Sequence, residues 1–96
     1  MNKGNCPFDE DPNVMVLTTK KIINKQEEIR TVYHDADDGM WQFLDGTDIN
    51  EDTMAIVGLT EVIGIDKTVV EVNDLPLGWV AWREEKGKPW YRKCEQ

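Results

Sequence analysis

Three aspartates at positions 35, 37 and 38 are spaced closely enough to suggest metal chemistry, because clustered carboxylates can bind calcium. An EF-hand loop needs oxygen ligands at its first, third and fifth positions, a glycine at the sixth and a glutamate at the twelfth. Counted from Asp35, the fifth position is Gly39 and the twelfth is Gly46, so the pattern fails. We therefore interpret the segment as a solvated hairpin turn and expect no metal site.

Residue types for nucleophilic or zinc chemistry are scarce. The chain has one histidine, His34, no serine, and two cysteines, Cys6 and Cys94, each near a terminus. These residues supply at most three zinc ligands and lack a C-x-x-C spacing, and nothing in the sequence brings a cysteine to His34. We expect reduced thiols, with a bridge between Cys6 and Cys94 as the alternative. We expect no enzyme and no cofactor, although an acid–base pair of carboxylates in a cleft stays open.

The acidic residues are concentrated in one span. Residues 31–66 contain nine Asp and Glu and no Lys or Arg, so the net charge of −8 arises there. A surface of this sign attracts basic partners and repels polyanions. Basic residues near the C-terminus interleave with Trp82, Trp90 and Tyr91, a pattern that can hold single strands by stacking. Nucleic-acid binders are usually basic overall, so we expect a basic protein partner and no nucleic acid. We interpret these aromatic residues instead as core residues and the charges beside them as a solubilising edge of the sheet.

Hydrophobic spacing predicts one small α+β domain over residues 14–93, after a flexible lead-in at 1–13 and before a tail at 94–96. A mostly antiparallel sheet of about five strands is expected from segments 14–17, 28–34, 40–44, 54–59, 78–83 and 89–92. Two or three short helices are expected over residues 20–25, after an N-cap at Thr60, and over residues 67–72 with Asp66 as the cap. The Asp38-Gly39 step predicts a hairpin that places Trp41 and Phe43 on one face.

The beginning of the chain resembles neither a secretory signal nor a membrane anchor. The first 13 residues contain no apolar segment, and no apolar run approaches the ~20 residues that cross a bilayer. We therefore expect a cytoplasmic protein without membrane contact.

Two segments carry a resemblance to known proteins. The first, HDADDGMWQFLDG, runs from His34 to Gly46; the second comprises Ile65-Asp66, LPLGWVAWR at residues 75–83, and Pro89-Trp90. They resemble a family of small, uncharacterised bacterial proteins and, more loosely, the immunity-protein domain (Imm family, type thirty-three) of polymorphic toxin systems. The wider family has approximately the pattern D-x-G-W-x-F-x-x-G, then an I-D step and P-x-G-x-A-x-x-R. Here Met40 is an extra residue between Gly39 and Trp41, and Arg83 follows Ala81 at a shorter interval. The residues of these segments that we assign to turns and core are Gly39, Phe43, Gly46, Asp66, Pro76, Gly78, Trp79, Arg83 and Trp90.

The resemblance implies an accessory binding protein, one that neutralises a toxin, rather than a catalyst. We expect it to engage a basic protein through an acidic face, with Trp41 as either an anchor or a core residue. The expected contact residues are Asp35, Asp37, Asp38, Trp41, Asp45, Asp48, Glu51 and Asp52. One alternative is a small enzyme or ligand-binding domain with a cleft that holds carboxylates beside Trp41 or Trp79. Another is a structural or regulatory domain whose acidity only confers solubility.

Overall fold

The computed structural model describes residue 11 and residues 13–95, which build a six-stranded sheet and three short helices. The strands are β1 (Met15–Thr19), β2 (Thr31–His34), β3 (Trp41–Leu44), β4 (Met54–Gly58), β5 (Trp79–Trp82) and β6 (Tyr91–Cys94). The helices are α1 (Lys20–Ile23), α2 (Leu59–Ile65) and the 3-10 helix η1 (Lys67–Val72). The predicted α+β class is confirmed, with six strands where about five were expected.

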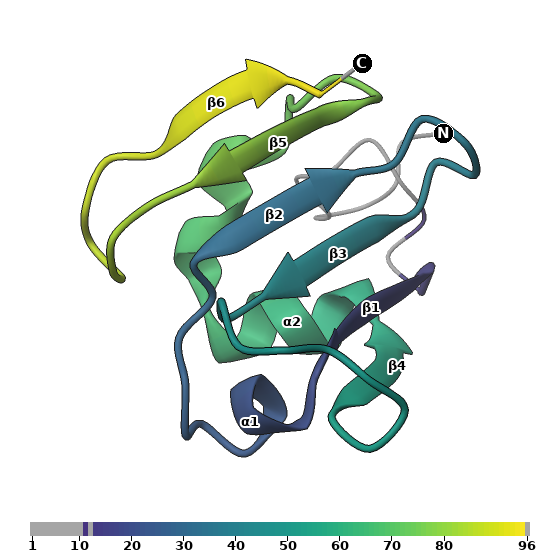
Figure 1. The fold of residues 1–96 in the computed structure, drawn as a ribbon, viewed down its shortest axis with the longest axis vertical. Coiled ribbons are helices and arrows are strands. Elements are labelled where there is room, and N and C mark those ends of the chain that lie inside the picture. The colour runs from purple at the N-terminus through teal and green to yellow at the C-terminus, as the bar shows by residue number, and fades with distance from the viewer. Residues whose placement is uncertain (1–10, 12, 96) are drawn as a thin grey trace.

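The strands follow the order β4-β1-β3-β2-β5-β6 across the sheet, as the ribbon shows (Figure 1). All neighbours are antiparallel except β1 and β3, which run parallel with Leu17 opposite Gln42. The predicted hairpin joins β2 to β3 and pairs His34 with Trp41. The other side of β2 pairs with β5, which comes from far along the chain.

The helices lie on one face of the sheet, behind it in Figure 1. Side chains alternate between the two faces of a strand, so each strand contributes every second residue to this covered side. Trp41 and Phe43 both lie there, as predicted, and are 2% and 0% exposed. Strand residues meet helix residues in one buried cluster that includes Val16, Val32, Phe43, Ala81, Leu59, Val62, Val69 and Val72.

Helix α1 begins as the sequence predicts, whereas α2 does not. The Thr19 hydroxyl accepts a hydrogen bond from the Ile22 amide at 3.1 Å, so Thr19 is the N-cap of α1. This helix is shorter than the predicted 20–25, and Lys25 adopts a φ of 62° just beyond its end. Helix α2 begins at Leu59, one residue before the predicted cap Thr60, and its cap is Gly58 without any side-chain bond.

The predicted cap of the third helical segment, Asp66, is confirmed. The Asp66 carboxylate accepts a hydrogen bond from the Thr68 amide at 2.9 Å and so begins η1. The last strand lies two residues further along than the predicted 89–92, because Pro89 and Trp90 are irregular and the strand pairing begins at Tyr91. Cys94 therefore belongs to β6 rather than to a tail, and it is exposed. Cys6 and most of the predicted lead-in lie outside the described residues.

Candidate functional site

The expected acidic face is divided between the two ends of the β2–β3 hairpin. Asp35, Asp37 and Asp38 precede β3 at one end, and the residues from Asp45 onward follow β3 at the other end. Strand β3 has four residues, and a strand rises about 3.3 Å per residue, so roughly 13 Å of strand separates the two groups. The eight residues proposed from the sequence therefore do not form one continuous surface.

The first acidic group is the hairpin turn. The Asp38 carboxylate accepts a hydrogen bond from the Met40 amide at 2.9 Å, and Gly39 adopts a φ of 72°, as the predicted Asp-Gly turn requires. The Asp35 carboxylate accepts a hydrogen bond from the Gln42 side chain. The turn thus explains Asp35 and Asp38 by local bonds, while Asp37 is exposed at its tip.

The second acidic group contains one buried member. Asp45 is 2% exposed, and its carboxylate accepts hydrogen bonds from the Thr19 hydroxyl at 2.7 Å and the Thr47 amide at 2.8 Å. Burial alone would raise the pKa of Asp45, but bonds from Thr47 and Thr19 and the nearby Lys21 charge lower it below its usual value. Asp45 is therefore a structural carboxylate, whereas Asp48, Glu51 and Asp52 are exposed.

Trp41 is a core residue and not a surface anchor. Its ring stacks on His34, with 3.9 Å between ring centroids. The His34 Nδ1 atom lies 2.7 Å from the Leu75 carbonyl oxygen, which can only accept, so Nδ1 carries the hydrogen. A hollow of about 440 Å³ lies beside these residues and is also lined by Asp74. Among the described residues, Asp74 is the one acid that lines this hollow near Trp41, and it is paired with Arg92 at 3.1 Å, so the hollow does not hold the group of carboxylates that the ligand-binding alternative requires.

Asp66 and Arg83 form a buried ion pair on the covered side of the sheet. Arg83 donates to the Asp66 carboxylate at 2.7 Å, to the Thr68 hydroxyl at 2.8 Å and to the Ile29 carbonyl at 3.0 Å. Its guanidinium also lies 4.2 Å from the centre of the Trp90 ring. Burial would raise the pKa of Asp66, but the Thr68 bonds and the Arg83 charge together lower it. Asp66 is therefore an ionised structural group and is unsuited to be a general acid.

The other residues of the family resemblance also serve the fold. Gly46 and Gly78 have positive φ values in turns, and Phe43 is fully buried. Trp79 is half-buried, and Pro76 is exposed just before the turn into β5. The resemblance thus marks the residues that build the hairpin and the core rather than a cluster that could do chemistry.

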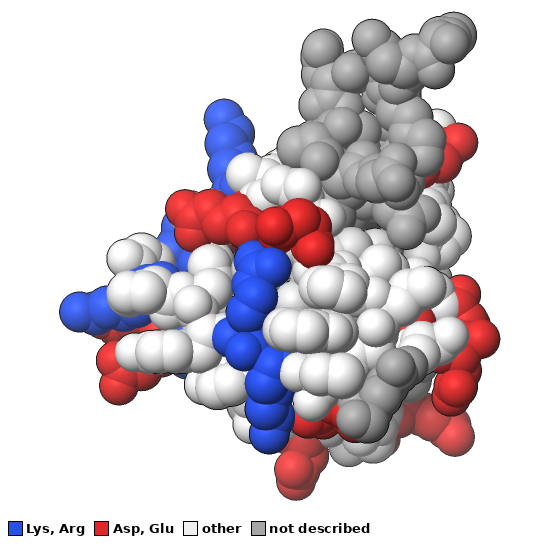
Figure 2. Space-filling view, turned by 90° about the horizontal axis from the view of Figure 1, so that it is seen from above, with Lys and Arg blue, Asp and Glu red and all other residues white. Residues whose placement is uncertain are grey.

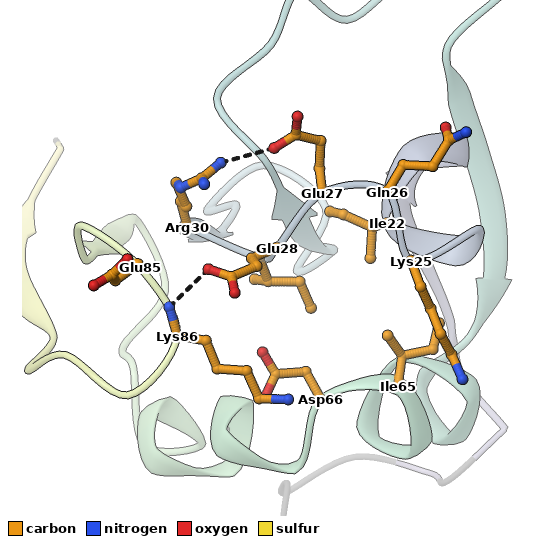
Figure 3. Close-up of a pocket in the computed structure, with 11 residues that line it drawn as sticks. Ile22, Lys25, Gln26, Glu27, Glu28, Arg30, Ile65, Asp66, Glu85 and Lys86 are labelled. Atoms are coloured by element: carbon orange, nitrogen blue, oxygen red, sulfur yellow. Dashed lines mark hydrogen bonds and ion pairs between the residues drawn. The ribbon is translucent and has the colours of Figure 1, made fainter.

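A hollow of about 520 Å³ lies between the α1–β2 connection, the end of α2 and the turn before β6 (Figure 3). Its charged lining residues are Lys25, Glu27, Glu28, Arg30, Asp66, Glu85 and Lys86. The carboxylates are largely bound by the chain itself: Arg30 pairs with Glu27 at 3.0 Å, and the Lys86 amide donates to Glu28 at 3.0 Å. Asp66 is already held by Arg83. The hollow therefore offers few carboxylates that are not already bonded to other groups of the chain and could act in catalysis.

The face of the sheet opposite the helices carries aromatic and aliphatic side chains. No helix from the described part of the chain lies in front of this face in Figure 1. We call it the open face. The strand registers place one row of side chains across all six strands: Ile56, Leu17, Gln42, Tyr33, Val80 and Lys93.

Trp82 and Tyr91 stand beside this row and are the main aromatic groups of the open face. They are paired across β5 and β6, their ring centroids lie 5.9 Å apart, and they are 38% and 56% exposed. At the other end of the face, Met15 and Ile56 are 52% and 45% exposed. The sequence favours Trp82 and Tyr91 as core residues, with nucleic-acid stacking as the alternative, and the structure instead exposes both. The signal for their position is that an aromatic residue occupies the paired position on each strand of the last hairpin.

Charges around the open face are mixed rather than uniformly acidic. Viewed from above, at the β6 end of the molecule, a band of Lys and Arg runs among separate groups of Asp and Glu (Figure 2). On the open face itself, Lys93 lies 3.6 Å from Glu95 and 6.0 Å from the Trp82 ring. The hairpin carboxylate Asp35 reaches the same face through its bond to Gln42. The face therefore carries Gln42 and Tyr33 on its two central strands and aliphatic and aromatic side chains on the strands to either side, with carboxylates at its margin.

Comparison with protein-family models, with curated proteins and with solved structures finds no significant match. Within the described residues, no helix has the length and apolar character needed to cross a membrane. In that same part of the chain, no three His, Cys, Asp or Glu side chains gather as metal ligands would. Function must therefore be argued from the geometry.

Proposed function

We propose that this protein is a non-catalytic binding module that docks a basic protein on its open face. The observation that carries the proposal is the stacked, exposed pair Trp82 and Tyr91 on a sheet face that the described helices leave uncovered. Aromatic residues of this kind are enriched at the energetic centres of protein interfaces. A toxin protein, as the family resemblance implies, is one partner of the required charge. A cytoplasmic location, where thiols stay reduced, is part of the same proposal.

The acidic groups would act before contact rather than at its centre. Asp37 at the hairpin turn and Asp48, Glu51 and Asp52 at the opposite end are exposed. Separated carboxylates on a molecule of net charge −8 create a field that raises the association rate of a basic partner. The aliphatic and aromatic side chains of the open face, with Trp82 and Tyr91 among them, would then be desolvated in the complex and supply most of the affinity.

The test compares three forms of the protein in a pull-down from the native host at low salt. The double variant Trp82→Ala, Tyr91→Ala removes the exposed aromatic pair, and Leu77→Ala removes a side chain that is 53% exposed away from the open face. We expect the wild type and Leu77→Ala to retain the same basic protein. The double variant should bind it at least ~30-fold more weakly, which corresponds to about 2 kcal/mol for a central interface residue.

The salt dependence of binding distinguishes the role of the exposed carboxylates from that of the aromatic pair Trp82 and Tyr91. Replacing Asp48, Glu51 and Asp52 by their amides should slow association and reduce its salt dependence, while leaving dissociation nearly unchanged. Capture that is equal for the wild type and the aromatic double variant, or that does not change with salt, would show that the open face is not the docking surface.

A further inference from the structure

The two edges of the sheet differ in charge. Edge strands present unpaired backbone groups, and natural proteins protect them with charges, prolines or bulges. Strand β6 carries Arg92 and Lys93 and is protected in this way. Strand β4 reads Met-Ala-Ile-Val-Gly, without a charge or a proline. The edge at β4 therefore lacks the usual protection.

The pairing with β1 determines which backbone groups of β4 point outward. Lys20 donates to the Thr53 carbonyl and Leu59 donates to the Val14 carbonyl, both at 2.8 Å, so residues 53 and 59 face β1. Backbone groups alternate in direction along a strand. Residues 55 and 57 thus also bond to β1, and Met54, Ile56 and Gly58 direct their N–H and C=O groups away from the sheet.

The ends of this outer edge are already closed. The Met54 amide donates to the Asn50 carbonyl at 3.0 Å. Gly58 is the N-cap of α2, and the carbonyl of an N-cap accepts the first bond of its helix. Among the described residues, four outward groups of this edge remain without a partner: the Met54 carbonyl, both groups of Ile56 and the Gly58 amide.

We propose that a second copy of this chain pairs with β4, antiparallel and edge to edge, with the two-fold axis at Ile56. The four remaining groups are self-complementary in this register. The two Ile56 residues exchange two hydrogen bonds, and each Met54 carbonyl accepts from the Gly58 amide of the other copy. Every outward group of the edge is then used.

The side chains are compatible with this pairing. Ile56 is 45% exposed on the open face, and it would lie beside Ile56 of the second copy, next to the exposed Met15. Pairing two β6 strands instead would place Arg92 and Lys93 of one copy against those of the other, and like charges directly opposite destabilise a sheet. The β4 edge, rather than the β6 edge, is therefore the one that can pair with the same edge of a second copy.

Net charge sets the conditions for the dimer. Each copy carries −8, and Glu51 and Asp52 before β4 would approach Glu61 of the other copy, just after its β4. Repulsion between the copies is screened by salt. Dimerisation should therefore strengthen as salt is added, whereas binding of the basic partner proposed above should weaken. The dimer proposal does not rest on the existence of that partner.

Sedimentation of the full chain tests the proposal at about 0.01 M and about 1 M salt, where the Debye length is ~30 Å and ~3 Å. The variant Ile56→Lys places two lysines opposite each other, and Leu77→Lys makes the same charge change at an exposed site away from the edge. We expect wild type and Leu77→Lys to dimerise more tightly at high salt and Ile56→Lys to dimerise at least tenfold more weakly.

Hydrogen exchange of the wild type provides a second readout that does not require a variant to fold. Exchange of the Ile56 and Gly58 amide hydrogens should become slower as protein concentration rises. Exchange of the Ala55 and Val57 amide hydrogens, which are already bonded to β1, should not change with concentration. A protein that stays monomeric up to about 1 mM at both salts overturns the proposal, as does equal dimerisation of Ile56→Lys. Protection of Ile56 and Gly58 only after a Lys-rich peptide is added would assign the edge to a partner strand instead.

Discussion

Replacing Arg83 with methionine should destabilise the fold by about 3–5 kcal/mol, because it leaves the Asp66 carboxylate charged and buried without its partner. The Arg83 side chain is 0% exposed, its pair with Asp66 is 2.7 Å long, and it also bonds to Thr68 and Ile29. A domain of this size has a total stability of about 5–15 kcal/mol, so the loss is a large fraction of it. The midpoint of thermal unfolding should fall by at least ~12 °C.

A double-mutant cycle with Asp66→Asn isolates the pair. Each single variant leaves one buried group without its partner, whereas the double variant Arg83→Met, Asp66→Asn removes both charges. We therefore expect the double variant to be no less stable than Arg83→Met, with a coupling of about 2–3 kcal/mol. Urea unfolding followed by Trp fluorescence and circular dichroism provides the free energies.

Arg92→Met serves as the matched control. Arg92 pairs with Asp74 at 3.1 Å, but the two side chains are 33% and 73% exposed. Exposed pairs contribute about 0–1 kcal/mol, so this variant should remain close to the wild type. The reasoning is refuted if Arg83→Met costs no more than Arg92→Met, or if the two single changes of the cycle simply add.

Two further predictions concern acid and glycine. The folded pKa values of Asp45 and Asp66 are lowered, so the unfolded chain binds more protons in acid, and stability is lost as pH falls below about 5 and through those lowered values. Asp45→Asn and Asp66→Asn should each lose stability less steeply over that range in urea unfolding, and an unchanged slope would contradict the assignment. Gly64 lies inside α2 with open space where a Cβ would stand, so Gly64→Ala should stabilise by about 0.5–1 kcal/mol. Gly39 has equally open space but a φ of 72°, so Gly39→Ala should destabilise by about 1–2 kcal/mol; thermal unfolding that moves both midpoints in the same direction would refute the backbone explanation.

Local features of the sequence predicted much of the fold. The Asp38-Gly39 turn, the placement of Trp41 and Phe43 on one side of the sheet, and the Asp66 cap of η1 all depend on residues that are neighbours along the chain. Such features follow from turn geometry, alternation and capping. The α+β class follows from them.

Strand order and the position of charges could not be predicted in the same way. The parallel pairing of β1 with β3 depends on packing across the whole sheet and has no local signal. The acidic span was treated as one face because it is continuous along the chain. In the structure a strand divides it, Asp45 bonds to Thr19, and Asp66 bonds to Arg83. A charged residue does not reveal from the sequence alone whether a distant partner will bury it.

The place of β2 in the sheet has a consequence for how the chain folds as it is made. β2 pairs with β3 in a local hairpin, but its other edge pairs with β5, which is distant in the sequence. The hydrogen bond between Arg83 and Ile29 likewise joins residues 54 positions apart. Closing a loop of that length costs entropy before any contact offsets it, and sheets dominated by distant pairings fold slowly, in milliseconds to seconds. Until β5 emerges from the ribosome, one edge of β2 is unpaired and the Asp66 carboxylate, although bonded to Thr68, lacks its ion-pair partner Arg83. The core of this protein is therefore completed only after β5 and Arg83 have been synthesised.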